Sequence, residues 1–174
     1  MQTRYRLRTS LFTFGPTSRE IRTTYAQSGF QLLELLMAIA IISIIALIAI
    51  PSYSQYRDKA DIMAAKGDIS SISLALSQYY SDNRSYPDSL DEIGMDDLKD
   101  PWGNPYKYLK IAGADTKGKG KLRKDKNLVP VNNDFDLYSM GKDGASTPAF
   151  TAKTSQDDIV RANNGKFVGL VADY

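Results

Sequence analysis

The apolar and polar positions of the chain divide it most clearly at an uncharged stretch that ends at a proline. Residues 35–50 carry no charged side chain, and residues 30–33 extend the apolar stretch on the other side of Glu34. Together these residues number about 21, and a helix needs about 20 apolar residues to cross a bilayer. We therefore predict a transmembrane helix over residues 30–51. An unpaired carboxylate in such a helix costs a few kcal/mol, so Glu34 is a candidate functional residue.

Beyond Pro51 the apolar residues recur at intervals of three and four positions. This spacing predicts an amphipathic helix that ends near Asp82 and Asn83. The two halves then form one helix of about 50 residues and about 75 Å. Because proline removes one backbone hydrogen bond, Pro51 should weaken or kink this helix. The apolar positions of the second half are Ile62, Ala65, Ile69, Ile72, Leu76 and Tyr79.

The remaining residues, 84–174, carry short apolar runs between clusters of Gly, Pro, Asn and Asp. Residues 85–90 are typical of a turn with a short helical piece after it, whereas residues 106–111, 134–139 and 166–170 are typical of strands. The single tryptophan, Trp102, is expected to pack against the long helix. We predict an α+β fold, in which the amphipathic half of the long N-terminal helix packs on a small antiparallel sheet that carries a C-terminal loop.

The charges of the chain are distributed unevenly around the apolar stretch. Residues 1–29 carry five arginines and one glutamate, a net charge of +4, whereas the whole chain carries +2. The positive-inside rule places such a basic end in the cytoplasm and the chain beyond the helix on the other side of the membrane. We therefore expect a leader over residues 1–29, a membrane helix over 30–51, an amphipathic helix over 52–83 and a sheet-and-loop region over 84–174.

The composition argues against several classes of chemistry. The chain has no cysteine and no histidine, so it lacks disulfides, thiolates and the commonest general base. Residues 113–120 approach a phosphate-binding loop, but Gly120 stands where that motif needs Ser or Thr to hold magnesium. The basic residues of segment 112–127 could contact nucleic acid or anionic lipid headgroups, but we expect this segment to be a solvated loop. We expect no enzyme, no nucleotide site and no nucleic-acid partner.

The start of the apolar stretch resembles a known processing site. Gly29-Phe30-Gln31-Leu32-Leu33-Glu34-Leu35, followed by an Ile- and Ala-rich run and Pro51, resembles the cleavage and methylation signature of type IV pilins and type II secretion pseudopilins. The resemblance implies that a prepilin peptidase cleaves after Gly29 and that Phe30 becomes the N-methylated first residue. It also implies that Glu34 pairs with the Phe30 amine of a neighbouring subunit during assembly. Gln31 replaces the more usual threonine.

Two later segments resemble the major pseudopilins of type II secretion. The first is Asp100-Pro101-Trp102-Gly103-Asn104-Pro105-Tyr106, and the second runs from Phe135 to Gly144 and continues at Asp157-Asp158-Ile159. By spacing alone, the aspartates of the second segment are weak candidates for a hard cation, which prefers six to eight oxygens. The resemblance implies a structural calcium ion, and residues 146–154 depart from it as a longer insert. The implied ligands are the side chains of Asp143, Ser155, Asp157 and Asp158 and the carbonyls of Met140 and Ala145.

The resemblance carries a function with it. It implies a structural subunit of a periplasmic pseudopilus in type II protein secretion, assembled with copies of itself into a helical filament. It places the protein in the bacterial inner membrane as a single-pass protein, with its N-terminus cytoplasmic and its C-terminal domain periplasmic. The implied partners are the prepilin peptidase, the minor pseudopilins and the inner-membrane assembly platform.

Two alternatives remain open from the sequence. The first is a subunit of a type IV pilus or a DNA-uptake pilus, which the basic segment 112–127 slightly favours. Two features disfavour it: the chain has no C-terminal cysteine pair, and it has a calcium-type loop. The second alternative is a membrane-tethered enzyme, and the chain offers no histidine or nucleophile–base pair in its support.

Overall fold

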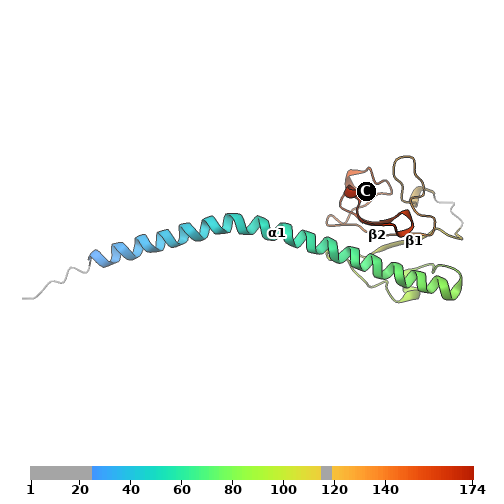
Figure 1. Ribbon diagram of the computed structural model, residues 1–174, viewed down its shortest axis with the longest axis horizontal. Coiled ribbons are helices and arrows are strands. Elements are labelled where there is room, and N and C mark those ends of the chain that lie inside the picture. Colours follow the sequence, from blue (N-terminus) through green and yellow to red (C-terminus); the bar gives the residue numbers. More distant parts are fainter. Residues whose placement is uncertain (1–24, 115–118) are drawn as a thin grey trace, which may run out of the picture. The chain divides into compact units, whose positions relative to one another are not determined.

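The computed structural model describes residues 25–114 and 119–174 (Figure 1). Helix α1, Tyr25–Asn83, contains Pro51 and ends where the sequence predicts. The chain divides after Ile48 into two compact units. Residues 1–24 of the leader predicted over residues 1–29 lie outside the described residues. Part of the segment that approaches a phosphate-binding loop, residues 115–118, lies outside them as well.

In the first unit, α1 exposes apolar side chains. Phe30 is 72% exposed and Leu47 is 75% exposed. Among the described residues, one helical segment, Phe30–Asn83, is long and apolar enough to cross a membrane by length and composition. So much exposed apolar surface along a helix requires lipid or other apolar helices around it.

In the second unit, the amphipathic part of α1 supplies one side of the hydrophobic core. Four of the six apolar positions predicted from the spacing of three and four are buried and the other two are partly buried, so the predicted helix face is confirmed. Ile62 packs against the core at its edge, and Tyr79 is half-buried with its hydroxyl donating to Glu92. The residues with no exposed area are Ala65, Ile69, Ile72 and Leu76.

Four short strands form an antiparallel sheet in the order β1-β2-β3-β4. They are β1 Lys107–Lys110, β2 Phe135–Ser139, β3 Ile159–Ala162 and β4 Phe167–Leu170. Strands β1, β2 and β4 lie within or beside the segments that the sequence predicts. Strand β3 was not predicted, because all four of its residues are buried and it shows no alternation of apolar and polar positions.

The sheet buries both of its faces. Successive residues of a strand point to opposite faces, and Ile159 joins the cluster that contains the α1 residues, whereas Val160 joins a second cluster. The first cluster also contains Phe135 and Leu137 of β2, with Trp102 packed at its edge as predicted. The second cluster contains Val131 and Phe150 from connecting segments and Val171 from the short helix after β4. The α+β fold is therefore confirmed, with connecting segments as the layer opposite the helix.

Candidate functional site

The first candidate site lies at the beginning of the apolar part of α1. Gly29 and Phe30 are both in the helix, and Glu34 follows Phe30 by one helical turn on the same face. The side chains of Phe30 and Glu34 are exposed. The chain has no lysine or arginine between Glu34 and Arg57, which is 23 positions further along the sequence. A cation for Glu34 must therefore come from the amino-terminal side or from another molecule.

The second candidate site is the β2–β3 loop, residues 140–158, which contains all six predicted calcium ligands. Its first turn packs tightly against Asp157. Gly141 has φ +66°, and a Cβ at this position would overlap the Asp157 carbonyl and carboxylate. The Asp143 N–H donates to Asp157 Oδ2 at 3.0 Å, and the Ala145 N–H donates to Asp143 Oδ1 at 2.7 Å. The structure thus brings Asp143 and Asp157 together across the loop.

The other two predicted side-chain ligands have different partners. Asp158 is completely buried, and its Oδ2 accepts from Arg123 at 2.6 Å and from Ser146 Oγ at 2.5 Å. The Ser155 hydroxyl donates to the Thr147 carbonyl at 2.9 Å. Asp158 Oδ1 is buried without a hydrogen-bond partner, which is the one feature here that suits a metal ion.

The geometry of the β2–β3 loop does not fit a calcium site built from all six predicted ligands. Calcium takes six to eight oxygens around one centre. Among the described residues, no three acidic side chains gather closely enough to hold a metal ion. Asp143 and Asp157 form one set, whereas Asp158 and Ser155 belong to a second set around Arg123 and the insert. Calcium binding, with Met140 and Ala145 as carbonyl ligands, remains an expectation from the resemblance alone.

Most described residues of segment 112–127 are exposed, as expected for a solvated loop, but Leu122 and Arg123 are exceptions. Leu122 is 5% exposed and Arg123 is 3% exposed. The Arg123 N–H donates to Asp136 Oδ2 at 2.9 Å, and the other oxygen of Asp136 accepts from Asn132 at 3.0 Å. Burial raises the pKa of the Asp136 carboxyl above its ordinary value. Arg123 and Asp136 were not singled out from the sequence as buried residues. The only sequence feature that indicates burial of Arg123 is its apolar neighbour Leu122.

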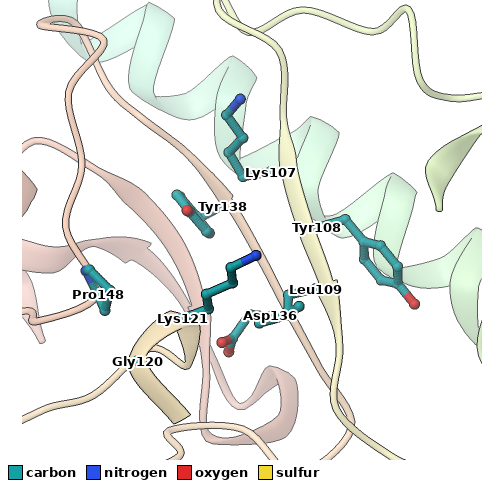
Figure 2. Close-up of a pocket in the computed structure, with 8 residues that line it drawn as sticks. All are labelled: Lys107, Tyr108, Leu109, Gly120, Lys121, Asp136, Tyr138 and Pro148. Carbon is teal, nitrogen blue, oxygen red and sulfur yellow. The ribbon is translucent and has the colours of Figure 1, made fainter. Parts of the chain in front are cut away.

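A shallow pocket beside this region carries no catalytic arrangement. Figure 2 shows the residues that line it, from strands β1 and β2, the basic segment and the insert. Its charged groups are Lys107, Lys121 and Asp136, and both oxygens of Asp136 already accept hydrogen bonds. The remaining lining residues are Tyr108, Leu109, Gly120, Tyr138 and Pro148. The carboxylate in the lining is therefore already hydrogen-bonded within the fold.

Comparisons with known proteins agree on one family. No family model and no solved structure matches the chain. The "Type II secretion system core protein G" of Pseudomonas aeruginosa is 33% identical over 141 residues, which cover 68% of this chain and 85% of the relative. Proteins of the same name from Aeromonas hydrophila and Escherichia coli are 32% and 31% identical, and the matches cover 85% and 88% of those relatives. The chain therefore belongs to the family of the type II secretion system core protein G, the major pseudopilin.

Proposed function

We propose that this protein is a structural subunit of a type II secretion pseudopilus and forms a helical filament with copies of itself. The observation that carries the proposal is the apolar part of α1, whose side chains are exposed along its length. Such a helix can be stored in a membrane as a single chain. It can also be buried against the same helix of neighbouring subunits when a filament forms, because both surroundings are apolar.

The proposal includes processing and location. A prepilin peptidase cleaves after Gly29, and Phe30 becomes the N-methylated first residue. The arginine-rich leader keeps the N-terminal end in the cytoplasm, and the sheet-bearing unit lies in the periplasm. Minor pseudopilins and an inner-membrane assembly platform are the further partners, and no catalytic role is assigned.

Deletion of the gene tests the role in secretion. We expect the deletion strain to retain its exoproteins inside the cell and to regain secretion when the wild-type gene is supplied in trans. Twitching motility and natural transformation should be unchanged, because these depend on type IV or DNA-uptake pili. The measurement is exoprotein activity in cell-free medium beside twitching and transformation assays. Normal secretion with loss of twitching or transformation would instead identify a pilus subunit.

The mass of the mature protein tests the processing. We expect the protein purified from membranes to have the mass of residues 30–174 with one added methyl group. Substitution Gly29→Glu should leave the full leader attached, since the side chain would occupy the position next to the cleaved bond. Ser28→Ala serves as the matched control and should be processed normally. A wild-type protein that begins at any residue other than Phe30 would contradict the assignment.

A further inference from the structure

Arg123 is a buried cation at the centre of the loops that cover the outer face of the sheet. One guanidinium nitrogen lies 2.6 Å from Asp158 Oδ2. The other terminal nitrogen donates to Ser146 Oγ at 2.6 Å and to the Thr147 carbonyl at 2.8 Å. The side chains of Arg123 and Asp158 are 4% and 0% exposed, so these bonds are made away from water.

Two aromatic rings also lie against the guanidinium, whose Nε is buried without a hydrogen-bond partner. Its central carbon lies 4.2 Å from the centre of the Tyr138 ring and 5.1 Å from that of the Phe150 ring. Aromatic faces attract cations, most strongly where water is excluded. A buried charge is costly unless it is paired and hydrogen-bonded, and Arg123 has a carboxylate, a hydroxyl, a carbonyl and two rings around it.

The residue that follows this cation also ties the two segments together. The Lys124 N–H donates to the Pro148 carbonyl, and the Phe150 N–H donates to the Lys124 carbonyl, both at 2.9 Å. Arg123 therefore connects the segment between β1 and β2 with the β2–β3 loop, and through Asp158 it reaches the residue before β3. These contacts hold the β2–β3 loop closed at the place where the resemblance implies a structural calcium ion.

The insert explains why an arginine takes this position. Ser146, Thr147 and Phe150 all belong to residues 146–154, the segment that departs from the calcium loop of the family. Their oxygens and ring face Arg123. Ser155, a predicted calcium ligand, is bonded to Thr147 of the insert. The insert thus draws two of the predicted ligands, Ser155 and Asp158, into the set around the arginine.

A calcium ion would compete with Arg123 for the Asp158 carboxylate, the one predicted calcium ligand that the guanidinium contacts. A carboxylate, a hydroxyl and a carbonyl are the ligands that calcium prefers, but here they already surround a positive charge. A divalent ion on the Asp158 carboxylate would lie a few Å from the guanidinium, where like charges repel strongly in a water-excluded site. Without Ser155 and Asp158, one oxygen of each remaining carboxylate already accepts a backbone N–H. The predicted ligands that then remain are the carboxylates of Asp143 and Asp157 and the carbonyls of Met140 and Ala145.

We propose that Arg123 is a built-in cation that replaces the calcium ion of the family, so that the β2–β3 loop closes without any metal. The chain carries its own positive charge to Asp158, and the insert supplies the remaining ligands. Folding of this protein is then independent of calcium concentration. The proposal concerns closure of the loop and holds whether or not the chain assembles into a pseudopilus.

The test compares calcium dependence with dependence on Arg123 in the full mature protein in detergent micelles. Thermal unfolding is followed by the fluorescence of Trp102. We expect the melting temperature of the wild-type protein to be the same in millimolar calcium and in excess EGTA. Arg123→Met should lower it by about 10–15 °C, because breaking a buried pair leaves an uncompensated charge. Lys142→Met removes the exposed pair with Asp58 and is the control, with a shift of no more than about 2 °C.

A double variant separates the charge pair from general loss of packing. Arg123→Met combined with Asp158→Leu removes both buried charges, and it should recover at least half of the loss caused by Arg123→Met alone. This comparison, together with the wild-type calcium series, still decides the question if the single variant fails to fold. The proposal is overturned if calcium raises the wild-type melting temperature and EGTA lowers it. It is also overturned if Arg123→Met behaves like Lys142→Met, or if the double variant is no more stable than the single one.

Discussion

Replacement of Phe135 by alanine is expected to lower the free energy of unfolding of the sheet-bearing unit by about 3–5 kcal/mol. Phe135 has no exposed area and lies in the cluster between α1 and the sheet. Its ring makes an edge contact with Tyr86 at 5.1 Å, and the Arg161 guanidinium lies 4.0 Å from its centre. Alanine would remove all of these contacts and leave a cavity. Since small domains are stable by only about 5–15 kcal/mol, much of the stability would be lost.

Urea unfolding of the mature protein in detergent, followed by Trp102 fluorescence, measures this loss. Trp102 is the only tryptophan and packs against the same cluster, so its emission reports this core. The matched control is Leu74→Ala, because Leu74 lies on α1 and is 72% exposed. Its replacement should change the free energy of unfolding by about 0.5 kcal/mol or less. If Phe135→Ala costs no more than Leu74→Ala, the packing of α1 on β2 is wrong.

The helix and its buried face were predictable because the information is local. A helix of this length repeats its pattern many times, and each of Ala65, Ile69, Ile72 and Leu76 falls where the spacing requires. The strands that alternate or are bounded by Pro and Gly were recognised for a similar reason. Local spacing also located the segment from Gly29 to Glu34, whose distances along the chain are themselves the signal.

The parts that were missed depend on partners far away in the sequence. Strand β3 has the short sequence Ile-Val-Arg-Ala, and its arginine is buried by a bidentate pair with Asp134 that no pattern within the strand indicates. Arg123 stands between Lys121 and Lys124, so its surroundings along the chain indicate a solvated loop. Its burial is decided by Asp158, 35 residues later. Composition cannot reveal such a pair, because both members look like ordinary surface charges until the strands bring them together.

The same reasoning explains why the predicted calcium ligands were only partly brought together. Asp143 and Asp157 meet because the turn at Gly141 is compact and local. The position of Asp158 depends on Arg123, which lies between β1 and β2, and on Ser146 of the insert. Similarity between two loops predicts which residue types could be ligands. It does not predict which charged residues from other segments contact them.

Replacement of Glu34 by alanine or glutamine is expected to reduce subunit association by about 10²- to 10³-fold and to abolish visible filaments. Cleavage after Gly29 would create an α-amine on Phe30 that is largely protonated at neutral pH. No lysine or arginine lies between Glu34 and Arg57, so the amine of a neighbouring subunit is the cation we assign to this carboxylate. Losing one partner of a pair in an apolar medium costs about 3–5 kcal/mol, and each 1.4 kcal/mol is a factor of ten. The loss recurs at every subunit added.

Loss of membrane anchoring cannot explain this expected result, because removing a carboxylate makes the apolar helix easier to insert. The Glu34 variants should therefore remain processed and membrane-bound while filaments, imaged by electron microscopy after shearing, and secreted exoprotein both disappear. Ser43→Ala is the matched control, since Ser43 is an exposed polar residue of the same helix whose hydroxyl already donates to the Ile39 carbonyl. Filaments at normal yield from Glu34→Ala would show that the carboxylate does not set the register between subunits. Filaments from Glu34→Gln alone would show that a hydrogen bond is sufficient without the charge.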